Sequence, residues 1–428
     1  MKIYSSKSLS EKKLKKLFAR PAGEDEKVLS SVKQIVDNIK KDGHSSVIRY
    51  AKKLDGLKSN NILFTQKEIN NAASLIEPDL KKAINIAAGN IYKFHEKQKP
   101  HGYEIETMIG IKCERKYLPI ENVGLYIPGG SAVLFSTVLM LGIPAMIAGC
   151  KRIIMCSPVR NGKLEPALAY AAKTIGVNEF YNIGGAQAVA MMAYGTKEVN
   201  KVDKIFGPGN QYVTAAKSLV STDPKGCLID MPAGPSEVLI IADEKADEAF
   251  IASDLLSQAE HGIDSQVILL TTSELLANKV ITEVKIQLKE LPRNEIAEKC
   301  LKNSFVLIVN SIDEAMALSN NYAPEHLIIN VTNVKKYLKK IQNAGSVFVG
   351  PYSPESVGDY ASGTNHSLPT YGYAKSIGGV SVEAFMKGIT YQELSKEGLK
   401  NISETVIKMA EAEKLQAHAN AVKVRISK

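Results

Sequence analysis

Short apolar runs alternate with helical patterns from Val123 onward, and this alternation limits the possible folds more than any other feature of the chain. The first run, 123–127, is followed by the turn Pro128-Gly129-Gly130-Ser131 and a helical pattern. Further runs predict strands near residues 153–155, 180–183, 204–206, 238–241, 267–270, 305–309 and 347–349. Strands that alternate with helices in this way predict a parallel sheet flanked by helices.

A proline-rich turn, Pro232-Ala233-Gly234-Pro235, divides these strands into two series. A chain of 428 residues is too long for one small core. Two doubly wound halves with a boundary near this turn are therefore the simplest interpretation. Residues 1 to about 23 are interpreted as an extended arm, and the segment after about Ser381 as a separate helical element. We predict the α/β class, with one small element at each end.

Composition excludes several classes of function. Lys and Arg number 54 against 45 Asp and Glu, for a formal charge of +9, but the lysines are scattered and form no stripe of the kind that binds nucleic acid. The five cysteines are odd in number and contain no Cys-x-x-Cys pair, which indicates a reducing compartment. The first 20 residues do not resemble a signal peptide, and no apolar window is long enough to span a membrane. We expect a cytoplasmic protein that binds neither nucleic acid nor membrane.

Three glycine-rich turns follow predicted strands: Gly129-Gly130, Gly184-Gly185 and Gly207-Pro208-Gly209. Ligands of open parallel sheets bind at the carboxyl ends of the strands, and backbone amides at a helix start suit phosphates. None of these turns is a Gly-x-Gly-x-x-Gly or a Walker motif, and a tight strand-to-helix turn requires glycine in any case. A phosphate-binding role and a purely structural role both remain open.

Two polar pairs carry groups that are suited to chemistry. Gln258 and His261 are three residues apart at the end of a predicted helix, so they share one helical face. They are either half of a metal site or a polar helix terminus that Gly262 caps. Glu325 and His326 are adjacent after a proline that halts the preceding helix. They are either a proton-transfer pair or an exposed loop pair without a role.

Two further stretches add candidate ligands. The segment 358–366 is polar and irregular, as binding sites and lids often are. Its Asp359 could ligate a metal, and His366 could equally be a hydrogen-bonded structural histidine. Glu413 and His418 are five residues apart on the terminal helical pattern and do not share a face. Oxygen and imidazole donors without cysteine fit Zn²⁺ or another first-row divalent ion.

Seven motifs in order and spacing resemble the histidinol dehydrogenase family, from about residue 28 to residue 426. They are VGLYIPGG (123–130), NIGGAQ (182–187), FGPGN (206–210), DMPAGPSE (230–237), LSQAEHG (256–262), PEH (324–326) and GDYASGTNH (358–366). Val133 and the pair Val159-Arg160 depart from the family pattern. They lie near the residues that the resemblance implies for cofactor binding, and they include none of the implied metal ligands.

Matched motif by motif, the resemblance implies roles for particular residues. The implied zinc ligands are Gln258, His261, Asp359 and His418, the last donated across a domain-swapped homodimer. Glu325 and His326 are the implied acid–base pair. The implied NAD contacts are Tyr126, Gln187 and Asn210. The implied contacts with the substrate, L-histidinol, are Ser236, Gln258, His261, His326, Asp359, Glu413 and His418.

The resemblance also implies a fold related to the aldehyde dehydrogenases, with two incomplete Rossmann-like, doubly wound domains. The first is discontinuous, over 24–126 and 237–381. The second, over 127–236, lies on the NAD side. Residues 1–23 remain an N-terminal arm, and 382–428 form a helical element that reaches the partner subunit.

The implied reaction is the NAD-dependent, four-electron oxidation of L-histidinol to L-histidine through L-histidinal, the last steps of histidine biosynthesis. Zinc would orient the substrate, His326 would act as general base, and Glu325 would activate water for the second oxidation. Four protein ligands close a tetrahedral site, so the ion would have to expand its shell to take up the substrate. A zinc hydrolase with the same His, Asp and Glu set and a non-catalytic nucleotide-binding protein are the alternatives.

Overall fold

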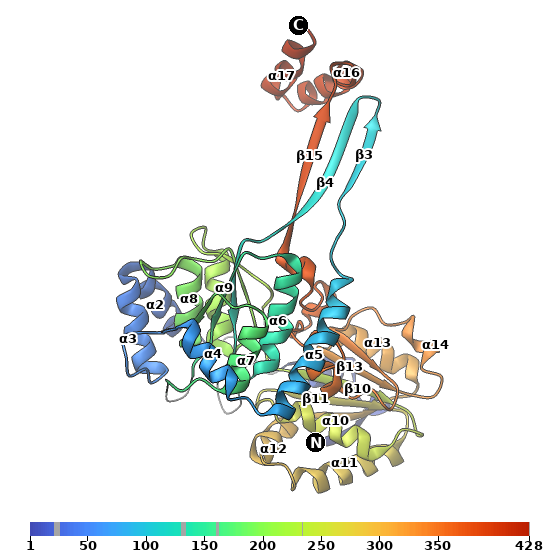
Figure 1. The fold of residues 1–428 in the computed structure, drawn as a ribbon. Helices are drawn as coiled ribbons and strands as arrows, with labels where there is room; N and C mark the ends of the chain where they lie inside the picture. Colours follow the sequence, from blue (N-terminus) through green and yellow to red (C-terminus); the bar gives the residue numbers. More distant parts are fainter. Residues whose placement is uncertain (21–25, 130–133, 160–161, 233, 428) are drawn as a thin grey trace.

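Two six-stranded sheets and one three-stranded sheet organise the computed structural model, which describes residues 1–20, 26–129, 134–159, 162–232 and 234–427 (Figure 1). Helices cover the two large sheets, and the small sheet projects away from them. The predicted α/β class with parallel sheets is confirmed.

The first sheet is parallel throughout and is built mainly from the second strand series. In spatial order its strands are β1 (Lys2–Ser5), β12 (Phe305–Ile308), β11 (Gln266–Thr271), β10 (Glu237–Ala242), β13 (His326–Asn330) and β14 (Ser346–Val349). Alternate side chains of β10 enter two different cores, since Val238 packs with α10 to α12 and Leu239 packs with α13. Their bounds are α10 (Glu248–Ala259), α11 (Glu274–Leu288), α12 (Asn294–Lys302) and α13 (Ile312–Tyr322). Because both faces are covered, the central strands are continuous apolar runs.

The second sheet is built around the first strand series. In spatial order its strands are β2 (Leu63–Phe64), β7 (Glu179–Tyr181), β6 (Arg152–Cys156), β5 (Asn122–Tyr126), β8 (Lys204–Phe206) and β9 (Leu228–Ile229), of which β2 alone runs antiparallel to its neighbour among the described strands. One face carries α4 (Gln66–Ser74), α5 (Pro78–Glu96), α6 (Phe135–Ala148) and α7 (Pro166–Thr174). The other face carries α2 (Glu26–Asp42), α3 (His44–Leu54), α8 (Gly185–Tyr194) and α9 (Gln211–Thr222).

A long antiparallel arm leaves the body of the molecule (Figure 1). It consists of β3 (Tyr103–Met108), β4 (Ile111–Pro119) and β15 (Met386–Leu394), with β4 between the other two. The helices α16 (Lys396–Ala412) and α17 (Gln416–Ile426) sit at its far end. No helix within the described ranges is long and apolar enough to cross a membrane.

The strands that the apolar runs predict are all present, and their ends agree within two residues. The boundary turn 232–235 separates β9 from β10 and thus the two large sheets, although Ala233 lies outside the described residues. Gly130, Ser131, Val133 and Arg160 also lie outside them, as do residues 21–23 of the predicted arm.

The structure differs from the predicted division at three places. Residues 1–20 are not an extended arm, because β1 joins the first sheet and α1 (Glu11–Leu17) packs beside it. The segment 26–96 and β5 belong to the second sheet and its helices, although 24–126 was assigned to the first domain. The element 382–428 is not purely helical, because β15 pairs with β4 along nine residues. Most side chains of β15 are exposed, so this strand lacks the apolar pattern on which the prediction relied.

A buried ion pair fixes the third glycine turn. Lys217 on α9 donates to Asp230 Oδ1 (2.5 Å) and to the carbonyl oxygen of Gly207 (2.8 Å). The other oxygen of Asp230 accepts from the Gly207 amide (2.8 Å). Both charged side chains are almost fully buried. Gly207 also has a φ of 125°, and a Cβ there would lie 2.1 Å from the Tyr126 carbonyl oxygen, so glycine is required.

We predict that Lys217→Ala lowers the free energy of unfolding by about 3–5 kcal/mol, because it leaves the buried carboxylate of Asp230 without its cation. Chemical denaturation followed by circular dichroism measures the loss. Lys340→Ala is the matched control, since it removes a pair of similar length (2.6 Å) with Asp313 whose two side chains are exposed, and its effect should be much smaller. Equal midpoints for Lys217→Ala and the wild type would contradict this prediction.

Candidate active site

A cleft of about 940 Å³ lies between the two large sheets. One wall comes from the turn after β8, with Pro208, Gly209 and Asn210 at the carboxyl end of that strand. The opposite wall carries Ser236, Glu325 and His326, which lie at the amino ends of β10 and β13. The expectation that ligands bind at the carboxyl ends of the strands therefore holds for the turn after β8 in the second sheet but not for the polar groups of the first sheet.

Glu325 and His326 are not an exposed loop pair, because both are buried and line the cleft. His326 is the first residue of β13, a strand that the apolar pattern did not predict. The Glu237 amide donates to Glu325 Oε2 (2.8 Å), and the Glu237 carbonyl oxygen lies 3.1 Å from His326 Nδ1. One residue of β10 thus holds both members of the pair.

The ring of His326 lies among carboxylates. Its Nδ1 is 3.5 Å from Glu325 Oε2 and 3.9 Å from Glu355 Oε1, and its Nε2 is 3.6 Å from Asp359 Oδ1. Burial alone would lower the pKa of His326, but these carboxylates outweigh it and raise the pKa well above 6.5. Nε2 is buried and has no hydrogen-bond partner among the residues that the structure describes, which leaves it available for a ligand.

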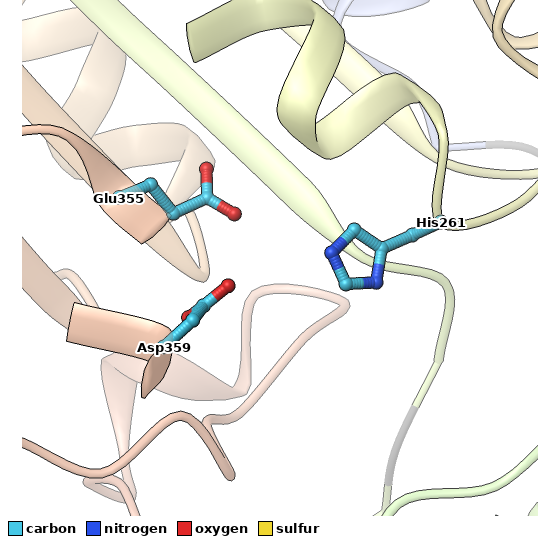
Figure 2. A group of neighbouring side chains, drawn as sticks. All are labelled: His261, Glu355 and Asp359. Carbon is cyan, nitrogen blue, oxygen red and sulfur yellow. The ribbon is translucent and has the colours of Figure 1, made fainter. Parts of the chain in front are cut away.

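His261, Glu355 and Asp359 form a group that could hold a metal ion. One ligand atom from each lies within 4.8 Å of the others. Figure 2 shows the two carboxylates, both on α15 (Glu355–Tyr360), pointing toward the His261 ring from the opposite side. His261 keeps exposed surface, but partial desolvation of its ring lowers the pKa of His261, which favours the neutral imidazole that binds metals.

Glu355 is the site residue that the sequence analysis missed. Its carboxylate is almost fully buried, and burial raises its pKa to about 8. A signal was present, because Glu355 and Asp359 are four residues apart after Pro354 and share a helical face. Oriented with its nitrogen toward Glu355, the carboxamide of Gln258 donates to Glu355 Oε2 (3.1 Å), and its oxygen accepts from the Glu237 amide (3.0 Å). The structure thus brings Gln258 to the same cluster.

His366 lies at the cleft with both ring nitrogens engaged. Nδ1 lies 2.9 Å from the Asp359 carbonyl oxygen, and Nε2 lies 3.1 Å from Thr137 Oγ1 on α6. Of the two interpretations of His366, the hydrogen-bonded structural histidine agrees with this geometry.

Of the three predicted NAD contacts, Asn210 lines the cleft. It caps α9 by accepting from the amides of Tyr212 (3.1 Å) and Val213 (3.2 Å). Tyr126 and Gln187 are buried beside the turn at Gly184-Gly185 instead. The Tyr126 hydroxyl accepts from the Gly185 amide (3.1 Å), and Gln187 Nε2 donates to Asp55 (3.0 Å). These contacts shape the turn.

Glu413 and His418 are far from the cleft within one chain. They lie at the end of α16 and on α17, beyond the tip of the arm (Figure 1). Lys414, with a φ of 60°, breaks the terminal helical pattern into two helices, so the two residues do not share one helix. Two of the predicted substrate contacts are thus displaced from the others in a single subunit.

Comparisons with known proteins agree with this architecture. The family model for histidinol dehydrogenase matches residues 18–426. The histidinol dehydrogenase of Vibrio parahaemolyticus is 51% identical over 422 residues, which cover 98% of this chain and 97% of the relative. The crystal structure of histidinol dehydrogenase from Elizabethkingia anophelis superposes with a TM-score of 0.95 at 50% identity and covers 100% of this chain and 98% of that one.

The fold alone is shared more widely. Succinate-semialdehyde dehydrogenase from Burkholderia pseudomallei superposes with a TM-score of 0.50 at 11% identity, over 86% of this chain and 90% of that one. The expected relation to the aldehyde dehydrogenase fold is confirmed. Across the parts of the chain that the structure describes, no cysteine lines the cleft. By the match of its family model and its close relatives along nearly its whole length, the chain belongs to the histidinol dehydrogenase family.

Proposed function

We propose that this protein oxidises L-histidinol to L-histidine through L-histidinal, with zinc and NAD⁺. The observation that carries the proposal is the convergence of Glu325, His326, His261 and Asp359 on one cleft between two Rossmann-like sheets. These residues come from three separate segments of the chain, and each segment is a motif that resembles the family.

The residues present fit a zinc ion. His261 and Asp359 offer one imidazole and one carboxylate at the spacing of a metal group, without a thiolate. Gln258 is buried beside them, and to ligate the ion its carboxamide would turn its oxygen from the Glu237 amide toward the metal. We assign Gln258, His261 and Asp359 as ligands in this chain, with His418 of the partner subunit as the fourth. When bound, zinc supplies a fixed positive charge that orients the polar groups of histidinol, and NAD⁺ supplies the acceptor for hydride.

His326 is the base in this proposal. The Glu237 carbonyl oxygen accepts a hydrogen bond from Nδ1, which leaves Nε2 to take the proton of the substrate hydroxyl. Glu325 has one oxygen fixed by the Glu237 amide. Burial raises the pKa of Glu325, which makes the carboxylate a stronger base toward water at the aldehyde stage. Both groups lie within the cleft, so the reactive aldehyde is kept from bulk water.

The position of Glu413 and His418 supports a homodimer in which each subunit completes the other's site. Both residues are carried on a protruding arm, away from the cleft of their own chain. The arm exposes apolar side chains, among them Tyr103, Ile105 and Tyr391, which suits a surface that a second subunit covers. We propose that both residues contact histidinol in the partner's cleft and that Ser236 contacts it from the chain's own wall.

The proposed function predicts an oxidation that depends on both zinc and NAD⁺. Purified protein with zinc, L-histidinol and NAD⁺ should form two NADH per histidine, a chelator should abolish turnover, and added zinc should restore it. NADH absorbance and product chromatography measure both. If the zinc-loaded protein forms no NADH from histidinol, the dehydrogenase is contradicted and the zinc hydrolase is favoured, and NAD⁺ binding without turnover would favour a nucleotide-binding protein.

The second prediction concerns protonation of His326. Carboxylates raise its pKa in the metal-free protein, so zinc held by His261 and Asp359 should lower it by neutralising that negative charge. His326 should therefore release its proton at a lower pH with zinc than without. NMR titration of ¹⁵N-histidine-labelled protein measures this, with His44 on α3 as the control resonance. Superimposable His326 titrations in the two states would refute the assigned metal position.

The third prediction concerns the exchange of His418 between subunits. His326→Asn and His418→Ala should each lose at least about 100-fold in kcat as homodimers, because a base or a ligand is missing from every site. Heterodimers of the two variants should regain activity, since the cleft of the His418→Ala subunit receives an intact His418 from its partner. Recovery to half of the wild-type activity per heterodimer is expected. Heterodimers as inactive as both parents would rule out the exchange.

A further inference from the structure

The Arg20 guanidinium lies at the cleft wall, where it joins two segments that precede the acid–base pair. It donates to both carboxylate oxygens of Glu237, from Nε to Oε1 (2.5 Å) and from a terminal nitrogen to Oε2 (2.8 Å). The same terminal nitrogen donates to the carbonyl oxygens of Tyr322 (2.8 Å) and Ala323 (3.3 Å). The guanidinium carbon also lies 3.9 Å from the centre of the Tyr322 ring.

We call Arg20 and the groups that it bonds, the Glu237 carboxylate and the carbonyl oxygens of Tyr322 and Ala323, the Arg20 clamp. Both sides of the clamp lie next to a functional group. Glu237 is the residue whose amide holds Glu325 and whose carbonyl oxygen holds His326. Ala323 stands two residues before Glu325 and adopts a φ of 54°, a left-handed conformation that is unusual for alanine. Such a conformation persists where the surroundings hold it, and Arg20 is bonded to its carbonyl oxygen. The Glu237 carboxylate is anchored once more by the Tyr371 amide (2.9 Å).

We propose that Arg20 and Glu237 are positioning residues for the oxidation, a pair that fixes where Glu325 and His326 stand. Arg20 sets the spacing between the start of β10 and the turn that leads into β13, and the backbone of Glu237 transmits that spacing to both functional side chains. A planar guanidinium suits this task, because its fork bonds a carboxylate and two carbonyl oxygens in one geometry. The first 20 residues thereby contribute to the site.

A purely structural role is the alternative, since β10 is already held by β11 and β13. The chain offers a matched pair for comparison. Arg152 donates to Glu179 from Nε (2.5 Å) and from a terminal nitrogen (3.0 Å), and its side chain is as buried as that of Arg20. That pair lies at the amino ends of β6 and β7 and does not line the cleft.

The test compares Arg20→Gln and Glu237→Gln, singly and together, with Arg152→Gln. All are studied as zinc-loaded full-length protein whose folding is verified by circular dichroism and melting temperature. The kinetic part of this inference rests on the proposed function. Arg20→Gln should lower kcat by about 10- to 100-fold, because small displacements of a catalytic group cost that much, and should leave KM for NAD⁺ nearly unchanged. The double variant should be no slower than the slower single variant, because the two residues act through one contact.

A second readout does not depend on activity. The Nδ1 proton of His326 should be protected from exchange with water in ¹⁵N-histidine-labelled wild type, with the resonance assigned by its loss in His326→Asn. It should exchange at least about 10-fold faster in Arg20→Gln, because its acceptor, the Glu237 carbonyl oxygen, is no longer held in place. Arg152→Gln should match the wild type.

The outcomes separate the two claims. Exchange and kcat in Arg20→Gln that equal those of Arg152→Gln would overturn the positioning role. If Arg20→Gln fails to fold, the nearly isosteric Glu237→Gln is compared with Arg152→Gln in the same way. If the wild type does not oxidise histidinol, the proposed function fails, and the exchange of the His326 proton still decides whether the clamp positions the ring.

Discussion

Four ionisable side chains are packed together where water is largely excluded: Glu325, His326 and Asp359 line the cleft, and Glu355 is buried next to them. The site depends on keeping them there. Burial disfavours each charge, so every group needs a partner. The backbone at the start of β10 supplies two of these partners through the amide and carbonyl groups of Glu237. The ring of His326 and the carboxylates around it supply the rest by mutual attraction. The remaining imbalance of negative charge is what suits the cluster to a cation.

The large sheets could be predicted from the sequence because their strands are continuous apolar runs between helices. The run 238–241 reads as a buried strand without further information, and β10 is buried along its whole length. The arm could not be predicted, because Thr390 and Tyr391 of β15 are exposed and the strand pairs with β4, which lies more than 260 residues earlier. The helices of 26–96 pack on the second sheet. The spacing of apolar residues predicts that such helices form, but it does not show on which sheet they pack.

Part of the site could likewise be predicted from local patterns in the sequence, and the rest depends on contacts between distant segments. Glu325, His326, His261 and Asp359 stood out as polar residues in motifs, and the structure brings them to one cleft. Arg20 did not stand out, because a single arginine near the N-terminus is an ordinary surface residue by pattern alone, and the one signal for Glu355 was its spacing of four residues from Asp359. Their roles follow from burial and from partners more than 90 residues away. The sequence also could not show that the polar groups of the first sheet lie at the amino ends of β10 and β13, because that placement depends on how the two sheets pack.

The most direct test of the metal-centred cleft is anomalous diffraction at the zinc absorption edge, from crystals grown with zinc and histidinol. We expect one strong peak per subunit beside His261 and Asp359, with histidinol between the peak and His326. We also expect a histidine from the arm of a second subunit to approach the same peak. A peak outside the cleft, or histidinol bound away from His326, would contradict the metal-centred cleft.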